Sequence, residues 1–209
     1  MGVIIAIDGP AGSGKSTIAR EVARRLGYQY VDTGAMYRAV AFAVLARGVD
    51  PSHTDAVAVV ARDIRIDLGS QVVVDDVDVT AAIRGPEVTG VVSAVAAQPA
   101  VRTELVRRQR ELVKPMAGVV VEGRDITTVV FPGAAVKVFL TASELERAGR
   151  RALQDADPDA EAVAADLARR DRLDSTRATS PLRVADAAVV IDTTGFTIGE
   201  VVEKVLSLL

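Results

Sequence analysis

Short apolar runs separated by amphipathic segments dominate the pattern of hydrophobic and polar positions along the chain. Five such runs recur, at residues 3–7, 28–31, 119–121, 136–140 and 188–191. Helical patterns lie between them. Short, nearly continuous apolar strands that alternate with helices are typical of a parallel sheet covered on both faces. The pattern therefore predicts an α/β fold in three layers, with about five parallel strands.

The segment that follows the first predicted strand carries a phosphate-binding sequence. Residues 9–16 read Gly-Pro-Ala-Gly-Ser-Gly-Lys-Ser and fit G-x-x-x-x-G-K-[ST] at every fixed position. Glycines let backbone N–H groups curl around an anion, and a helix that begins at this point directs its positive end at the charge. The alternative is a Gly-rich turn that binds nothing.

This phosphate loop predicts a nucleotide site with a metal ion. We expect Lys15 to reach the β- and γ-phosphates and the Ser16 hydroxyl to ligate Mg²⁺. The predicted nucleotide-binding residues are Gly9, Pro10, Ala11, Gly12, Ser13, Gly14, Lys15, Ser16 and Thr17.

One stretch breaks the alternation of strands and helices. Residues 64–68 and 72–74, joined around Gly69-Ser70, predict a short antiparallel hairpin, and residues 77–79 can add a third strand. A small sheet at about 62–92, inserted in a nucleotide-binding core, is interpreted as a lobe for a second substrate. The alternative is a surface hairpin without a ligand.

Polar residues follow three of the predicted strands. Residues 32–34 and 122–125 carry charges where a ligand is expected, because open α/β sheets bind ligands at the carboxyl ends of their strands. We expect these two segments to face the ligand. Residues 192–194, in contrast, can simply cap a turn.

Composition narrows the class of protein. A chain of 209 residues with 49% apolar content can bury about 70% of its unfolded surface, which predicts one compact domain over 1–209. There is no Cys, and the net charge of −3 argues against a nucleic-acid polymer as partner. The chain enters a strand directly and has no 18-residue apolar run, so we expect a cytoplasmic protein without a membrane segment.

Arginine supplies nearly all of the positive charge, since only four of the 25 basic residues are Lys. Arg147, Arg150 and Arg151 fall at i, i+3 and i+4 of a helix that begins like a capping box, with Ser143 and Glu146. Such closely spaced cations suit an anion lying among them.

A second arginine-bearing face follows a polar stretch. On the run that starts near residue 161, Arg170, Asp174 and Arg177 recur at i, i+4 and i+7. Two such faces predict a helical lid, at about 147–162, that closes over polyphosphate and expels water. The alternatives are solvated helix faces with ion pairs such as Glu146 to Arg150, and a genome rich in Arg codons.

Further segments resemble those of bacterial cytidylate kinases, a family of nucleoside monophosphate kinases. In chain order they are DTGAMYR at 32–38, residues 93–102 with RRQR at 107–110, EGRD at 122–125, VVFP at 129–132, ERA at 146–148 and DSTR at 174–177. The resemblance covers nearly the whole chain. It implies Mg²⁺-dependent transfer of the γ-phosphoryl group from ATP to CMP or dCMP, in a monomer.

The resemblance also assigns residues to the cytosine base. The family's cytosine contacts fall on Ser93, Arg102 and Asp125. Cytosine offers an exocyclic amine beside the N3 and O2 acceptors, so Asp125 and Ser93 can accept from the amine while Arg102 donates. Uracil presents a carbonyl in place of the amine, which Asp125 would reject.

The remaining acceptor contacts fall on residues that suit phosphate and ribose. The resemblance places the CMP phosphate on Arg38, Arg124 and Arg177, the ribose hydroxyls on Asp174 with Arg170 nearby, and a substrate-contacting hydroxyl on Thr33. Leu173 occupies a position that is often basic in this family, so no extra contact is expected there. Lys15, Arg147, Arg150 and Arg151 would then stabilise the transferring phosphoryl group and the leaving ADP.

Other nucleotide-binding classes fit less well. A GTPase switch carries N/T-K-x-D to read guanine, and no Lys of this chain is followed by Asp two positions later. A kinase of another small metabolite, such as shikimate or dephospho-coenzyme A, shares the loop and the lid but does not need the cytosine-reading residues. A regulatory protein that only binds a nucleotide is the other alternative.

Overall fold

The computed structural model describes residues 2–155 and 159–209, and the chain forms two compact units. One consists of Met1–Val31 and Val113–Leu209, and the other of Asp32–Leu112. We call them the sheet unit and the helical unit and describe each by itself.

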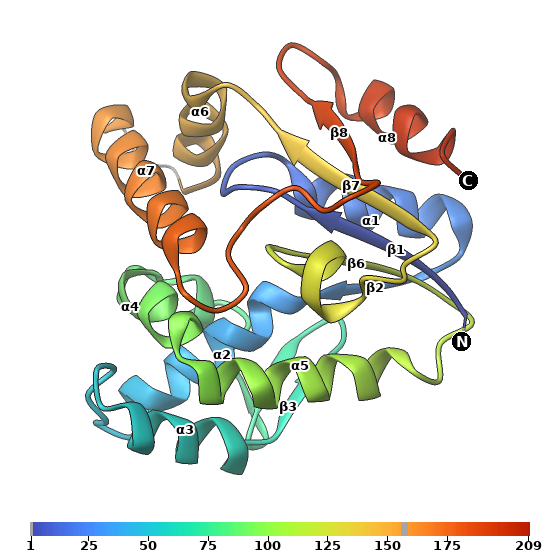
Figure 1. The fold of residues 1–209 in the computed structure, drawn as a ribbon. Coiled ribbons are helices and arrows are strands. Elements are labelled where there is room, and N and C mark those ends of the chain that lie inside the picture. Colours follow the sequence, from blue (N-terminus) through green and yellow to red (C-terminus); the bar gives the residue numbers. More distant parts are fainter. Residues whose placement is uncertain (1, 156–158) are drawn as a thin grey trace. The chain divides into compact units, whose positions relative to one another are not determined.

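The sheet unit is built on five parallel strands in the order β2-β6-β1-β7-β8 (Figure 1). Central β1 pairs in parallel with β6 on one side and β7 on the other. The strands are β1 Val3–Asp8, β2 Gln29–Asp32, β6 Gly118–Gly123, β7 Val136–Thr141 and β8 Val189–Asp192. Each contains or overlaps one of the five apolar runs, so the predicted fold class is confirmed.

Helices α1 (Lys15–Leu26) and α8 (Ile198–Leu206) pack together and share one apolar core with the strands. Ile18 and Val22 of α1 lie one turn apart, and both are buried in this core. The sheet unit also contains a π-helical turn η2 (Ile126–Val130) and helices α6 (Glu144–Asp155) and α7 (Ala160–Thr176), which pack against each other.

The start of α6 differs from the predicted capping box. Ser143 Oγ accepts from the Glu146 N–H at 3.3 Å, which is half of that motif. The Glu146 carboxylate instead accepts from the Gly195 N–H and from Arg150, while the Ser143 N–H donates to Thr194 Oγ1. The reciprocal bond is replaced because the loop after β8 offers partners for both groups.

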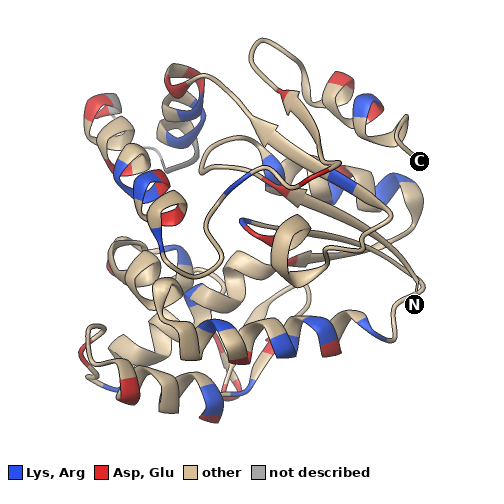
Figure 2. Ribbon diagram, viewed as in Figure 1, with Lys and Arg blue, Asp and Glu red and all other residues tan. Residues whose placement is uncertain are grey.

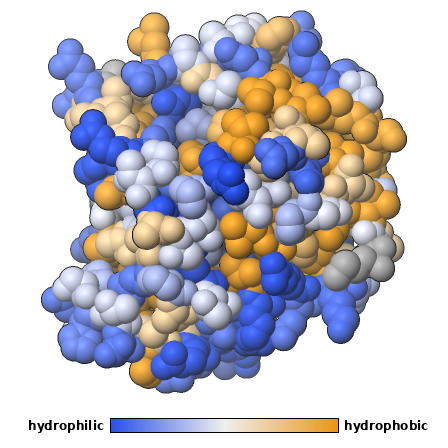
Figure 3. All heavy atoms as spheres, in the orientation of Figure 1, coloured by the Kyte–Doolittle hydropathy of each residue, from blue (hydrophilic) through white to orange (hydrophobic). Residues whose placement is uncertain are grey.

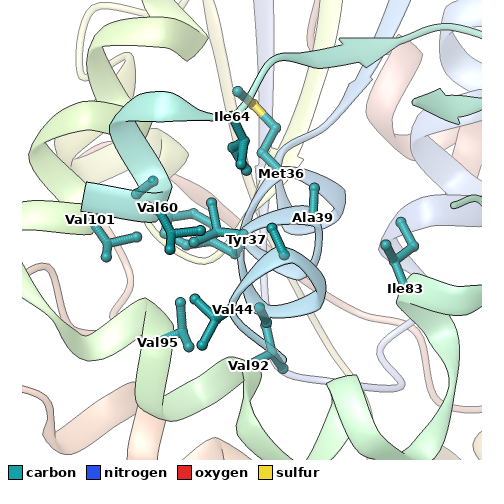
Figure 4. Close-up of a cluster of buried hydrophobic side chains, with 14 of the residues drawn as sticks. Met36, Tyr37, Ala39, Val44, Val60, Ile64, Ile83, Val92, Val95 and Val101 are labelled. Carbon is teal, nitrogen blue, oxygen red and sulfur yellow. The ribbon is translucent and has the colours of Figure 1, made fainter. Parts of the chain in front are cut away.

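The helical unit is built around α2 (Thr33–Ala46). This helix is apolar on nearly all sides, which is typical of a helix buried in a core. Figure 4 shows Met36, Tyr37 and Val44 of α2 among side chains from neighbouring elements. Those elements are α3 Thr54–Asp63, η1 Ala82–Arg84, α4 Pro86–Ala97 and α5 Pro99–Val113.

A three-stranded antiparallel sheet completes the helical unit, in the order β3-β4-β5. The strands are β3 Ile66–Leu68, β4 Val72–Val74 and β5 Val77–Asp78, so the predicted hairpin and its third strand are confirmed. Asp75 and Asp76 have φ values of 48° and 69°, and two successive positive φ angles form the tight turn between β4 and β5.

Hydrophilic residues dominate the surface over α3 and α5 (Figure 3). On α5, Arg107 bridges Glu104 and Glu111, and this side of the helix is solvated. No helix in the described ranges is both long and apolar enough to cross a membrane.

The core of the sheet unit predicts a contrast between two leucines. Leu140 of β7 is 0% exposed, whereas Leu145 of α6 is 86% exposed. Leu140→Ala is expected to lower the free energy of unfolding by about 2–5 kcal/mol, because it removes buried contacts and leaves a cavity. Leu145→Ala is expected to change it by no more than about 0.5 kcal/mol. Urea unfolding of both variants measures the difference, and similar values for the two would contradict the described core.

Candidate active site

The phosphate loop lies between the end of β1 at Asp8 and the start of α1 at Lys15. Two of its glycines are required by close approaches. A Cβ on Gly9 would lie 2.0 Å from the Leu140 carbonyl oxygen, and one on Gly12 would lie 2.8 Å from the Arg147 carbonyl oxygen. Gly12 and Gly14 also have positive φ, at 75° and 87°. The loop therefore curls against β7 and α6 in a way that side chains at these positions would prevent.

Lys15 is buried and turned back over the loop. Its Nζ donates to the Pro10 carbonyl oxygen at 2.7 Å and to Ser13 Oγ at 3.4 Å. Burial, followed by the nearby positive charge of Arg124, lowers the pKa of Lys15 to about 7. A negatively charged phosphate beside this ammonium group would relieve both effects.

The hydroxyl of Ser16 stands in the first turn of α1, as the predicted magnesium ligand requires. Within residues 2–155 and 159–209, no group of three or more His, Cys, Asp and Glu side chains could hold a metal ion. Magnesium in nucleotide sites is commonly held by one or two protein groups together with substrate phosphates and water. The chemistry of the donors here fits that mode.

The three arginines of α6 have different surroundings, and charges of both signs mark α6 and α7 (Figure 2). Arg147 is buried, donates to the Ala11 carbonyl oxygen at 3.1 Å and pairs with Asp171 of α7. Arg150 pairs with Glu146 at 2.7 Å and donates to Thr193 Oγ1 at 2.8 Å. The ion pair between Glu146 and Arg150, which the sequence offered as an alternative to an anion-binding lid, is thus present. Each of these two cations is therefore paired with a carboxylate.

Arg151 lies near a second group of arginines, on α7. The buried Arg170 has a lowered pKa, caused by burial first and then by the positive charge of Arg124, with a smaller contribution from Arg151. Arg169 pairs outward with Asp166 at 2.5 Å. Arg170 itself lies 4.0 Å from the same Asp166, so the two arginines share one carboxylate.

Five predicted CMP-binding residues lie in the sheet unit and form a charge network. Arg124 Nε donates to Asp174 at 2.8 Å, and Arg177 lies 3.8 Å from Asp174 and 3.9 Å from Asp125. Burial acts to lower the pKa of Arg124, but the charge and hydrogen bond of Asp174 outweigh it and raise that pKa. With Arg170, three guanidinium groups share this region with two carboxylates. Asp171 and Glu122 also act on Arg124, and the guanidinium groups of this network suit a phosphate.

The other four predicted CMP-binding residues lie in the helical unit. Arg38 is fixed by two hydrogen bonds of 2.9 Å, to the Ile83 carbonyl oxygen and to Thr89 Oγ1. Arg102 is 2% exposed, donates to the Ala96 carbonyl oxygen at 3.0 Å, and its guanidinium carbon lies 5.2 Å from the centre of the Tyr37 ring. The two hydroxyl residues of this set, Ser93 and Thr33, are also buried.

Sequence reasoning missed Asp8, which ends β1 directly before the phosphate loop. Its buried carboxylate accepts from the N–H groups of Ile126 and Thr127 at 2.9 and 2.7 Å, and from Thr127 Oγ1 at 2.6 Å. Burial raises the pKa of Asp8 despite these hydrogen bonds. Asp8 thus anchors the π-helical turn that follows Arg124 and Asp125. The available signal was an acidic residue at the end of a wholly apolar strand.

Asp171 was also missed, and Thr193 lies in a segment that was interpreted only as a turn cap. Thr193 is buried after β8, where it accepts from Arg150 and donates to the Thr141 carbonyl oxygen at 3.0 Å, beside the Ser13 carbonyl oxygen. Asp192 does cap its turn, accepting from the Thr194 N–H at 2.9 Å. Asp171 follows Arg170 directly, and no spacing rule distinguishes it from the other acidic residues of α7.

The parallel sheet and the phosphate loop together define a P-loop nucleotide-binding fold. A gluconokinase from Sinorhizobium meliloti 1021 has a similar fold, with a TM-score of 0.53 and 17% identity over 99% of this chain and 90% of that one. A protein from Thermus thermophilus called TT1252 has a TM-score of 0.51 and 19% identity, over 100% of this chain and 98% of that one. At these identities, the likeness concerns the fold alone.

The particular family follows from the sequence. Residues 5–209 match the family described as cytidylate kinase. The chain is 50% identical to a cytidylate kinase of Mycolicibacterium paratuberculosis, over 99% of this chain and 94% of the relative. It is also 50% identical to one of Geobacillus kaustophilus, over 99% of this chain and 96% of the relative. The chain belongs to the cytidylate kinase family.

The lowered pKa of Lys15 predicts a pH dependence of stability. Between pH 7 and 10.5, the unfolded chain keeps a proton on Lys15 that the folded protein releases, because the folded-state pKa of about 7 lies below the ordinary 10.5. The free energy of unfolding is therefore expected to rise with pH through this window.

Lys15→Met removes the titrating group and serves as the comparison. The difference in unfolding free energy, wild type minus variant, should increase between pH 7 and 10 when it is measured by urea unfolding. A flat or falling difference would show that the pKa of Lys15 is not lowered.

Proposed function

We propose that this protein is a cytidylate kinase that converts ATP and CMP or dCMP to ADP and CDP or dCDP. The observation that carries the proposal is a phosphate loop with a buried Lys15 in a chain that belongs to the cytidylate kinase family over residues 5–209. An oxygen of the CMP phosphate attacks the γ-phosphorus, and the bond from that phosphorus to the oxygen bridging to the β-phosphate breaks. The acceptor oxygen is already anionic, so positioning and charge neutralisation carry the catalysis without a general base.

The donor nucleotide would be held by the phosphate loop, from Gly9 to Thr17. Lys15 would exchange its bond to the Pro10 carbonyl oxygen for the β- and γ-phosphates. Ser16 would ligate Mg²⁺, which supplies charge neutralisation on those phosphates when it is bound. Arg147, Arg150 and Arg151 would stabilise the equatorial oxygens of the transferring group and the leaving ADP.

The acceptor phosphate would be bound by arginines whose side chains are already fixed. Arg38 is held by Thr89 and a backbone carbonyl, and Arg124 is held by Asp174. Arg177 is the third, and its Nε donates to the Ser180 carbonyl oxygen at 2.7 Å. Guanidinium groups fixed in this way bind a phosphate bidentately with little further loss of side-chain entropy. Asp174 would accept from the ribose hydroxyls, with Arg170 nearby.

The base would be read by Ser93, Arg102 and Asp125, with Thr33 as a further hydroxyl contact. Ser93 and Asp125 accept from the exocyclic amine of cytosine, while Arg102 donates to its acceptors. Arg102 and Asp125 are 2% and 3% exposed, so a base that does not match them would meet desolvated polar groups that favour cytosine.

We also propose the organisation that goes with this activity. Residues 1–209 act as one kinase domain, about 62–92 form a subdomain that binds the monophosphate, and about 147–162 form the lid. Residues 156–158 of that lid lie outside the described part of the chain. A monomer is the state that the family resemblance favours, and the cytoplasm is the proposed location.

A substrate panel tests the proposed function. Purified protein with ATP and Mg²⁺ is expected to phosphorylate CMP and dCMP, with kcat/KM for UMP lower by roughly 100-fold or more because Asp125 then faces a carbonyl. AMP, GMP and shikimate serve as further acceptors, and ADP release is the measurement. If neither cytidine nucleotide is turned over, the assignment is wrong.

Arg124 tests the division between donor and acceptor residues. Arg124→Ala removes a charge-assisted contact to the CMP phosphate, so KM for CMP should rise about 10- to 100-fold, while KM for ATP should change far less. Arg107→Ala, at an exposed arginine paired with Glu104 and Glu111, is the matched control and should retain both values. Equal losses toward both nucleotides in Arg124→Ala would refute the acceptor role.

A further inference from the structure

We propose that Asp171 is a positioning residue that holds Arg147 against the tip of the phosphate loop and orients its guanidinium group toward the donor phosphates. The inference rests on the proposed function, because it requires Arg147 to act on the transferring phosphoryl group. All of the atoms that carry it belong to the sheet unit.

The first observation is a closed ring of hydrogen bonds around Ala11. The Ala11 N–H donates to Asp171 Oδ1 at 3.1 Å, and Arg147 Nη1 donates to the Ala11 carbonyl oxygen, also at 3.1 Å. The same Nη1 donates to Asp171 Oδ2. One carboxylate thus bridges a backbone amide of the loop and a guanidinium group of α6.

The second observation concerns the part of Arg147 that the ring leaves unused. Its Nε–H is buried and has no hydrogen-bond partner in the described structure. Both bonds of the ring come from Nη1, so the edge of the guanidinium that contains Nε is left for another acceptor. That edge can bind two oxygens of a phosphate side by side. A buried donor without a partner, next to a phosphate loop, indicates that the acceptor is the nucleotide.

The third observation is the packing that brings Asp171 within reach. Ala11 shares a small apolar cluster with Ala148 of α6 and with Val163 and Leu167 of α7. Leu167 lies one turn before Asp171 on the same helix, so burial of Leu167 directs Asp171 toward the loop. On the α6 side, Gly12 allows the backbone of Arg147 to approach closely. The ring therefore forms where three separate segments are already in contact.

Asp171 can also act on the site through its charge alone. It is among the groups that raise the pKa of Lys15 against the dominant lowering by burial. A loss of activity on removing this carboxylate would therefore have two explanations, through Arg147 or through Lys15. Only a test that couples Asp171 to Arg147 separates them.

A double-mutant cycle provides that test, with kcat measured at saturating ATP and CMP for wild type, Asp171→Asn, Arg147→Ala and the double variant. The asparagine retains an oxygen for the Ala11 N–H but cannot hold the guanidinium as an ion pair. Asp171→Asn is expected to lower kcat about tenfold or more and to leave KM for CMP within about twofold. The double variant should be no slower than Arg147→Ala, because Asp171 then has nothing left to position. Losses that multiply in the double variant would overturn the proposal.

Two further variants keep the interpretation unambiguous. Glu203→Gln removes an exposed carboxylate from α8 of the same unit and should keep the wild-type kcat. Asp171→Glu retains the negative charge and should recover part of the kcat lost in Asp171→Asn. If thermal unfolding shows that the asparagine variant does not fold, the cycle is run with the glutamate variant and the same criterion.

The outcomes distinguish this inference from the proposed function. No CMP turnover by the wild-type enzyme would refute the function itself. Normal CMP turnover by both wild type and Asp171→Asn would leave the function standing and refute only the role of Asp171.

Discussion

Buried positive charge near the phosphate loop is the constraint on which the rest of the sheet unit depends. A buried ion costs several kcal/mol unless a partner of opposite charge and further hydrogen bonds compensate it. The protein compensates its cations with carboxylates, as in the pairs of Arg124 with Asp174 and of Arg147 with Asp171. Burial, followed by the positive charge of Arg124, lowers the pKa of Lys15 and of Arg170. A polyanion that entered this region would complete the charge balance.

The parallel sheet explains how residues far apart in the chain reach one edge. Strands β1, β6 and β8 end at Asp8, Gly123 and Asp192, and parallel strands direct these ends the same way. Asp8 can therefore bind the amides after β6, and Thr193 after β8 can meet Arg150 beside the loop. The loop is thus held by its own glycines and by the strand ends and helices around it.

In the helical unit, uncharged groups hold the side chains of two arginines in place. Arg38 and Arg102 are held by backbone carbonyls, a threonine hydroxyl and the face of Tyr37. A guanidinium fixed before the substrate arrives loses less entropy on binding. The apolar helix α2, which carries Tyr37 and Arg38, makes this possible because its burial fixes the backbone from which both side chains extend.

The sequence by itself determined the parallel α/β class, the five strands, the antiparallel hairpin and the position of the phosphate loop, because periodicity and glycine spacing are local properties. It also determined the family, through motifs spread over the chain. The tertiary structure decided which partner each charge takes. The Glu146 carboxylate binds Gly195 and Arg150 instead of completing the capping box. Asp8, Thr193 and Asp171 take partners that lie far from them in the sequence. The physical reason is that compensation of a buried charge depends on distance in space, and the nearest opposite charge often lies on a different strand or helix.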